Sequence, residues 1–374
     1  MSFFTPALAR RVAAGLVCLG ATAAYSITPP AEAQTVGAKR SSSPEPGPSS
    51  AGLSSAGTGS TSRAFTFAAA GDLGANAATA ASLAALDRST SSFFLALGDL
   101  DYDQTSSDQA WCDYVKDRLP GKGAGFPFEL LVGNHEEDGG TDGLITNFTD
   151  CLPDRLGSTI GPGSVYGAEY SFGYPAGDPL AQFIMIAPKL TVEGERHTYG
   201  PGSPHRAWLV RQIRRAREAG TRWIIVGAHY PCLTTGPRHG CDSGPAVFNL
   251  LLKKRVDVML GGHNHMYERS KQLRLNKSDC TRVRPGIFDA DCVVDNGADG
   301  VYQKGRGTVL VTAGSFGRTE VRADVDDSER RYFAKVGATT PGFAQFTVTR
   351  RRIRETFVRT SGTTLRDTFD ILER

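Results

Sequence analysis

The segment "AFTFAAAGDLG", residues 64–74, shows the pattern from which the fold of this chain can be predicted. A short apolar run is typical of a buried strand, and an acidic residue, Asp72, follows it in a glycine-flanked turn. An apolar run followed by glycine and a polar residue recurs in "FFLALGDLDY" (93–102), "FELLVGNHEE" (128–137), "WIIVGAHYP" (223–231) and "VDVMLGGHNH" (256–265). We therefore expect five strands that each end in a polar loop.

Helix-like segments separate some of these runs. Residues 76–88 are rich in Ala and Leu, and residues 203–220 carry the start signals Ser203 and Pro204 and the stop signal Gly220. Short apolar strands alternating with helices, with one further strand in "AQFIMIA" (181–187), predict βαβ units and a sheet buried on both faces. Period-two patterns predict antiparallel strands that complete a second sheet at residues 308–314, 342–349, 352–359 and 364–372.

Composition narrows the class of protein. The chain has 374 residues, 40% of them hydrophobic, so it can bury a large core in one large domain or two smaller ones. The net charge of +3 is too small to indicate nucleic-acid binding, and we expect no nucleic-acid partner. The densest basic run, Arg350–Arg352, is expected to be the solvated end of a hairpin. The sequence assigns no oligomeric state.

The N-terminal 62 residues do not resemble a folded domain. Arg10 and Arg11 precede a short apolar stretch, and "AEA" ends at Ala33, which predicts a signal peptide over residues 1–33. The stretch is short for a membrane span, so we expect an exported protein, secreted, periplasmic or at the cell surface, without a stable membrane anchor. An uncleaved anchor is the alternative. The arginine pair leaves twin-arginine export open. Residues 34–62 are Ser-, Gly- and Pro-rich and should form a disordered linker before a catalytic domain at 63–374.

Six cysteines remain after the predicted cleavage, which would remove Cys18. An even number in an exported chain predicts disulfides, for which six cysteines allow about 15 connectivities. We predict nearest-neighbour pairing because each bond would then close one long loop: Cys112–Cys151, Cys232–Cys241 and Cys280–Cys292.

Metal-binding residue types cluster in the five blocks. Four of the seven histidines fall there, together with Asp72, Asp99 and Asn134. Taken singly, an Asp after Gly or a histidine in a loop is more often an ordinary turn or surface residue. Since ligands of open α/β sheets bind at the carboxyl ends of the strands, we expect all five blocks to meet at one edge of the sheet. Their joint occurrence predicts a metal site.

The order "GDLG … GDLDY … GNHE … VGAHYP … GHNH" resembles the calcineurin-like metallophosphoesterase superfamily and, within it, the purple acid phosphatases. The resemblance extends from Phe65 to Leu372, and "YSF", "GSPHRAWLVRQI" and "HMYER" are similar to plant-type members. It implies an α/β fold, a four-layer α/β/β/α sandwich of two mixed sheets flanked by helices. Plant-type enzymes also carry an N-terminal fibronectin-like domain, whereas here only the linker precedes Phe65.

Two positions favour the purple subfamily. Gly74 stands where many relatives have a histidine ligand, and Tyr102 stands where purple enzymes have a tyrosine that suits Fe(III). The ligands that the resemblance implies for a ferric ion are Asp72, Tyr102, His265 and a bridging Asp99. Those implied for a second, divalent ion (Zn, Mn or Fe) are Asn134, His229, His263 and the same Asp99. Because residues two apart in an extended chain point the same way, both "GHNH" rings should face the cluster.

The implied reaction is hydrolysis of a small phosphate monoester by in-line attack of a metal-bound hydroxide. The resemblance implies that His135 contacts the substrate and assists the leaving group. His239 matches a phosphate-contacting histidine more loosely, and an ordinary surface histidine is the alternative. His197 and His205, in or near a helix start, are expected on the surface.

Two other functions stay open at this point. A phosphodiesterase or nucleotidase of the same superfamily would use the same metal ligands. A non-catalytic phosphate-binding protein on this fold is a further alternative, although such proteins usually lose some ligands and all of them are present here.

Overall fold

The computed structural model describes residues 64–238, 240–320, 322–362 and 365–373. The predicted signal peptide, the predicted linker, Arg63 and His239 lie outside these residues. Within the described ranges, no helix is long and apolar enough to cross a membrane.

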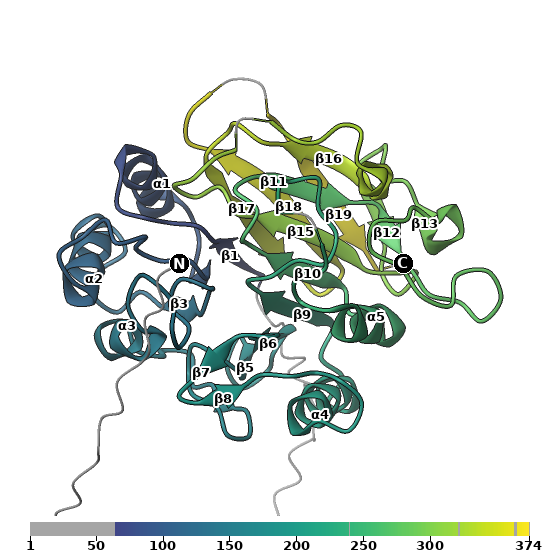
Figure 1. Cartoon of the computed structure of the whole chain (residues 1–374), viewed down its shortest axis with the longest axis horizontal. Coiled ribbons are helices and arrows are strands. Elements are labelled where there is room, and N and C mark those ends of the chain that lie inside the picture. Colours follow the sequence, from purple (N-terminus) through teal and green to yellow (C-terminus); the bar gives the residue numbers. More distant parts are fainter. Residues whose placement is uncertain (1–63, 239, 321, 363–364, 374) are drawn as a thin grey trace, which may run out of the picture. The chain divides into compact units, whose positions relative to one another are not determined.

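Two large mixed sheets form the centre of the described part (Figure 1). The first has the order β14 (Val301–Gln303), β19 (Thr368–Leu372), β18 (Arg352–Arg359), β17 (Gly342–Val348), β1 (Phe65–Ala70), β2 (Phe94–Leu97) and β3 (Phe128–Leu131). The second has the order β16 (Phe333–Gly337), β11 (Tyr267–Ser270), β15 (Val309–Ala313), β10 (Val258–Gly261), β9 (Trp223–Ala228), β6 (Ala181–Ile186), β5 (Tyr170–Tyr174) and β4 (Thr159–Ile160). Two small hairpins pair β7 (Thr191–Val192) with β8 (Glu195–Arg196) and β12 (Gln272–Leu273) with β13 (Val293–Asp295).

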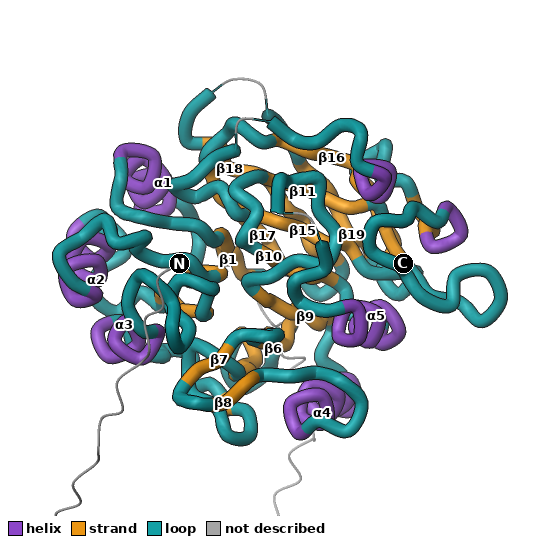
Figure 2. Tube along the Cα trace, viewed as in Figure 1, coloured by secondary structure: helices purple, strands orange, loops and turns teal. Residues whose placement is uncertain are grey.

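Helices lie at the periphery and strands in the middle (Figure 2). They are α1 (Ala77–Arg88), α2 (Asp108–Asp117), α3 (Ile145–Cys151), α4 (Pro204–Glu218), α5 (Pro245–Lys254), and the 3₁₀ turns η1 (Ala290–Cys292) and η2 (Ser328–Tyr332). In Figure 1, α1, α2 and α3 stand together on one flank, and α4 and α5 on another. The two predicted helices, α1 and α4, are confirmed.

Alternating side chains show how the layers stack. On β6, Phe183 packs into the core between the two sheets, while Ile184 packs with α4 and α5 on the outer face. Phe183 meets Phe67 of β1 across the sheets with ring centroids 5.0 Å apart. A sheet buried on both faces must be apolar at every position, which explains the uninterrupted apolar runs of its central strands. The predicted four-layer α/β/β/α arrangement is confirmed.

The predicted helix starts form as their capping residues require. Asn76 Oδ1 accepts hydrogen bonds from the backbone of Ala78 at 2.9 Å and of Thr79 at 3.1 Å, which satisfies two N–H groups at the start of α1. Ser203 Oγ accepts one from the backbone of Arg206 at 3.1 Å at the start of α4.

The C-terminal strands are placed differently from the prediction. We expected them to complete a second sheet, but β17 pairs antiparallel with β1, so β17, β18 and β19 extend the sheet that begins with β1. β15 instead runs parallel to β10 in the other sheet. Local patterning specifies a strand and its buried face, whereas its neighbours are chosen by long-range packing. Arg350 and Arg351 are exposed in the β17–β18 turn, as predicted.

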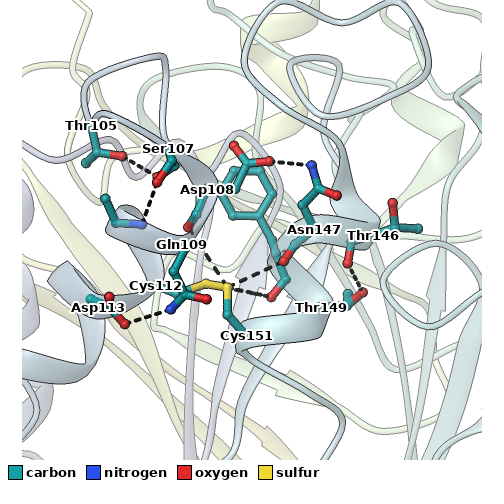
Figure 3. Close-up of a disulfide and its surroundings, with 12 residues drawn as sticks. Thr105, Ser107, Asp108, Gln109, Cys112, Asp113, Thr146, Asn147, Thr149 and Cys151 are labelled. Carbon is teal, nitrogen blue, oxygen red and sulfur yellow. Dashed lines mark hydrogen bonds between the residues drawn. A yellow bond between two sulfur atoms is a disulfide. The ribbon is translucent and has the colours of Figure 1, made fainter.

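All three predicted disulfides are present. Cys112 of α2 is bonded to Cys151 of α3 across 39 residues that include β3 (Figure 3). Closing a loop of this length stabilises the fold by roughly 4 kcal/mol in the chain-entropy estimate. Asn147 Nδ2 also donates to Asp108 Oδ2 at 2.7 Å, so a hydrogen bond joins the same two helices (Figure 3).

Candidate metal centre

The five polar blocks meet, but at the junction of two sheets and not at the edge of one. β1, β2 and β3 belong to the first sheet, and β9 and β10 to the second. Direct hydrogen bonds join the two groups of strand ends: His229 Nδ1 lies 2.8 Å from the Leu97 carbonyl oxygen, and the His263 amide donates to Asp72 Oδ2 at 2.8 Å. The expectation of a single sheet edge was wrong because all five strands were assigned to one parallel sheet.

One set of donor atoms surrounds the hydroxyl of Tyr102. This hydroxyl lies 2.9 Å from Asp72 Oδ1, 3.1 Å from Asp99 Oδ2 and 3.0 Å from His265 Nε2. His265 Nε2 is also 3.3 Å from Asp72 Oδ1. Two carboxylates, a phenol and an imidazole thus converge, and they are the four residues predicted for the ferric ion.

A second set lies on the other side of Asp99. His229 Nε2 is 3.3 Å from Asp99 Oδ1 and 3.2 Å from Asn134 Oδ1. Each of Asp99, His229 and His263 offers one ligand atom, and these atoms all lie within 4.8 Å of one another. The four residues predicted for the divalent ion are therefore together as well.

Asp99 belongs to both sets through different oxygen atoms. Its Oδ2 faces Tyr102 at 3.1 Å, and its Oδ1 faces His229 at 3.3 Å. The side chain is only 2% exposed. A carboxylate with one oxygen directed to each donor set has the geometry of a ligand shared by two cations.

The donor set fits two metal ions chemically. Burial, followed by the charges of Asp72 and Asp99, raises the pKa of Tyr102 far above its ordinary value, so only a strong Lewis acid would take its phenolate as a ligand. Burial raises the pKa of Asp99, but His229 and other histidines lower it more, so this carboxylate stays ionised. Two buried carboxylates side by side are costly without cations to balance them.

The imidazole of His263 has a free ligand atom. Its Nδ1 is buried and has no hydrogen-bond partner in the described part of the chain, while its Nε2 lies 3.5 Å from Asp242 Oδ2. Burial and the neighbouring His229 hold the pKa of His263 well below its ordinary value, so the ring is neutral. A buried nitrogen without a protein partner on a neutral imidazole is suited to binding a metal in the tautomer that leaves it unprotonated.

Backbone strain concentrates at this site. Asp72, Asp99, Tyr102 and His263 all adopt the left-handed conformation, with φ of 62°, 55°, 57° and 66°. Residues other than glycine adopt this conformation uncommonly, although Asn, Asp and His do so more often than the rest. It costs roughly 1–3 kcal/mol per residue and is typical of functional sites. Both "GHNH" rings do face the cluster, but the reason given for it, an extended chain, was wrong, since φ at His263 is 66°.

The glycine at position 133, next to the predicted ligand Asn134, is required because no side chain would fit there. A Cβ atom at Gly133 would lie 2.1 Å from Asp99 Oδ1, closer than any side chain permits. The β3 end can therefore approach Asp99 only without a side chain at position 133, which explains the glycine in "GNHE".

Glu136 is a site residue to which the sequence analysis gave no role. Its Oε2 accepts hydrogen bonds from the backbone of Asp99 at 3.1 Å and of Gly133 at 3.0 Å, and its Oε1 accepts one from Leu100 at 2.6 Å. This buried carboxylate thus holds the strained turn of Asp99 against the end of β3. Its position directly after the predicted His135 was the available signal.

His135 lies at the open side of the centre. Its side chain is 27% exposed, and its Nε2 is 3.7 Å from Asp99 Oδ2. Its Nδ1 is in contact with Asp142, and Thr141 Oγ1 lies 3.2 Å away. The ring centroid is 4.5 Å from that of Tyr102. One ring nitrogen is thus held by a carboxylate and the other is directed toward the donor atoms.

The segment after β15, residues 314–320, contacts the loops of the centre from another side. Backbone hydrogen bonds join Gly317 to Asp72 at 3.0 Å and Glu320 to His265 at 2.9 Å. Glu320 Oε1 is 3.5 Å from His265 Nδ1, where it can orient the ring. This segment was not predicted to be part of the site, although "TVLVTAGSFGRTE" repeats the pattern of an apolar run followed by a glycine-rich polar turn.

Two further histidines among the described residues do not join the centre. His197 and His205 were predicted on the surface, but they are 0% and 1% exposed. His205 is held between Glu169 at 3.1 Å and Glu195 at 3.0 Å, partners distant in sequence that local analysis could not reveal. His239 lies outside the described residues, so its predicted phosphate contact stays a prediction.

Comparisons with known proteins agree with this geometry. Residues 65–267, which include all seven predicted ligands, match the family model described as calcineurin-like phosphoesterase. Over 229 residues the chain is 29% identical to purple acid phosphatase 22 of Arabidopsis thaliana, a match covering 60% of this chain and 49% of the relative. Purple acid phosphatase 21 of the same plant is 29% identical over 221 residues, covering 57% and 46%.

The chain thus spans about half the length of these curated relatives. Among solved structures, purple acid phosphatase PPD1 from yellow lupin (Lupinus luteus) seeds matches with a TM-score of 0.60 at 15% identity. That match covers 83% of this chain and 54% of the lupin chain. At this identity the likeness concerns the fold alone.

Proposed function

Because the chain belongs to the calcineurin-like phosphoesterase family, we propose that it is an exported, binuclear metal-dependent phosphatase that hydrolyses phosphate monoesters. The observation that carries this proposal is the position of Asp99. One of its oxygens faces the donor set of Tyr102, and the other faces the donor set of His229. The likeness to purple acid phosphatases supports the same reading.

The ligand assignment follows from the two donor sets. Asp72, Tyr102, His265 and Asp99 would hold Fe(III), because carboxylate and phenolate oxygens are hard anionic donors. Asn134, His229, His263 and Asp99 would hold a divalent ion, Zn, Mn or Fe, because neutral nitrogen and oxygen donors dominate there. When bound, two such cations neutralise charge on the phosphate and acidify a water molecule.

The role of assisting the leaving group is assigned to His135. Its partly exposed ring lies between the solvent and Asp99, and Asp142 holds Nδ1 so that Nε2 is directed to the centre. From this position it can donate a hydrogen bond or a proton to the ester oxygen that departs. The three disulfides support export to an oxidising compartment.

Metal analysis combined with visible absorption tests the centre. The purified protein should contain iron and absorb visible light by charge transfer from Tyr102, and Tyr102→Phe should abolish the colour while the chain stays folded. A colourless, iron-free and fully active protein would instead indicate a Zn or Mn phosphatase.

Substrate turnover tests the reaction. We expect a higher kcat/KM for an aryl phosphate monoester than for the corresponding bis-aryl ester. A clear preference for the diester would identify a phosphodiesterase on the same centre. If the metal-loaded protein hydrolyses no phosphate ester, a phosphate-binding function is indicated.

A further inference from the structure

Arg318 places a positive charge beside the candidate metal centre. The carbon of its guanidinium lies 4.3 Å from the centroid of the Tyr102 ring, and the residue is half-buried. Within the part of the chain that the structure describes, no carboxylate pairs with it. Arg238, which lies nearby, differs because its Nη1 donates to Glu320 Oε1 at 2.6 Å. Arg318 therefore has guanidinium donors that no acceptor among the described residues occupies.

The position of Arg318 is set by its backbone. The amide of Gly317 donates to the Asp72 carbonyl at 3.0 Å, and Asn76 Nδ2 donates to the Gly317 carbonyl at 3.0 Å. Two residues after Arg318, the amide of Glu320 donates to the His265 carbonyl at 2.9 Å. Residue 318 is thus held between two hydrogen-bonded anchors, both of which involve loops of the metal centre.

The contact of the Arg318 guanidinium with the Tyr102 ring leaves its N–H groups available for an anion. A guanidinium that lies over an aromatic ring makes that contact through its flat face. Its N–H groups point outward in its own plane, where they can bind two oxygens of a phosphate at once. The Tyr102 ring thus supports the guanidinium beside the centre, at 4.3 Å from the ring centroid, and leaves its N–H groups available to an anion there.

The surroundings favour the transferred phosphoryl group as the anion. Next to the centre a surface hollow of about 700 Å³ is lined by Glu320, Asp324 and Asp326, with Arg322 as its one basic residue among those described. Glu320 is paired with Arg238 at 2.6 Å, so the hollow does not itself select an anion. Arg318 lies over Tyr102, whose hydroxyl is within 3.1 Å of Asp72, Asp99 and His265, so the anion nearest to it is the phosphate held at the centre.

We propose that Arg318 binds a non-bridging oxygen of the transferred phosphoryl group and makes the site selective for monoesters over diesters. A monoester presents two negative charges, whereas a diester presents one and has a carbon substituent on the oxygen that would carry the second. The positive charge of Arg318 therefore favours binding of the monoester, which carries the second negative charge. This inference rests on the proposed function.

Three variants test this role in the full-length, metal-loaded protein. Arg318→Met removes the charge and the fork, Arg318→Lys keeps only the charge, and Arg322→Met removes one exposed charge four residues away as a matched control. For each variant, kcat/KM is measured with an aryl phosphate monoester and with its methyl diester. Binding of inorganic phosphate is measured by calorimetry, and bound metal per chain is determined.

Arg318→Met should lower kcat/KM for the monoester about 10- to 100-fold and weaken phosphate binding by a similar factor, as expected for the loss of a charge-assisted contact. The diester value should fall less than about threefold, Arg318→Lys should lie between, and Arg322→Met should resemble the wild type. Equal losses for both esters, or unchanged phosphate binding at normal metal content, would overturn the assignment. If the wild type hydrolyses no monoester, the proposed function fails, and phosphate binding alone then decides the role of Arg318.

Discussion

Replacing Glu136 by Gln should destabilise the protein and disorder the turn that carries Asp99. The carboxylate accepts three backbone hydrogen bonds, from Asp99, Leu100 and Gly133. Glutamine has nearly the same shape but only one acceptor oxygen, and its other terminal group is a donor. At least one backbone N–H group must therefore face a second N–H group in a site that is 1% exposed.

The better orientation keeps the oxygen near Asp99 and Gly133 and places the amide nitrogen near the Leu100 amide, where the glutamate oxygen now lies at 2.6 Å. Loss of one charge-assisted bond with an unsatisfied donor costs about 1.5–3 kcal/mol. Burial and the charge of Asp99 raise the pKa of Glu136 to about 8, so this cost applies above pH 8, where the carboxylate is ionised. There the two retained bonds also weaken because their acceptor is no longer charged. We expect a total loss of about 3 kcal/mol in the free energy of unfolding.

Urea unfolding of the metal-free, disulfide-intact protein at about pH 9, where Glu136 is ionised, measures this loss, and metal content after reconstitution reports on Asp99. Glu218→Gln is the control, because Glu218 makes an exposed pair with Arg214 and its substitution should cost less than about 0.5 kcal/mol. If Glu136→Gln unfolds like this control and binds metal normally, the three hydrogen bonds do not hold the turn.

Gly133→Ala should abolish metal binding and activity, since the new Cβ would lie 2.1 Å from Asp99 Oδ1, and metal analysis of folded protein checks this. Asp142→Asn should lower kcat at least about 10-fold for alkyl phosphates but little for nitrophenyl phosphate, because it weakens the contact that holds His135, the residue assigned to the leaving group. Equal effects on both substrates would contradict that assignment. Burial raises the pKa of Glu129 to about 7 from 4.5, so its protonated form stabilises the fold below pH 4.5 and this stability is lost as pH rises through 7. Glu129→Gln should remove that loss of about 3 kcal/mol, measured as unfolding free energy between pH 4.5 and 7.5.

The predicted ligands were accessible from sequence because each follows its strand within a few residues. An apolar run indicates the strand. The glycine beside Asp72, Asp99 or His263 indicates a turn in which there is no room for a side chain. The disulfides were accessible for a similar reason, because the bonded partners are neighbours in the list of cysteines.

Residues whose roles depend on distant partners were missed. His205 was expected on the surface, yet it is buried against Glu169, which lies 36 residues earlier. Glu320 meets His265 across 55 residues, and Arg318 meets Tyr102 across more than 200. No local periodicity encodes such contacts, because they depend on which strands become neighbours.

By itself, the sequence determined the strand-and-turn blocks, which depend on residues close together in the chain. The order of these blocks carried the family resemblance, from which the candidate ligands were assigned. Only the tertiary structure decided that the blocks belong to two sheets, with β17 beside β1 and β15 beside β10. It also decided that Asp99 lies between two donor sets and that Arg318 lies over Tyr102. The physical reason is that strand pairing and layer packing minimise exposed apolar surface over the whole chain, and the site forms where the resulting loops converge.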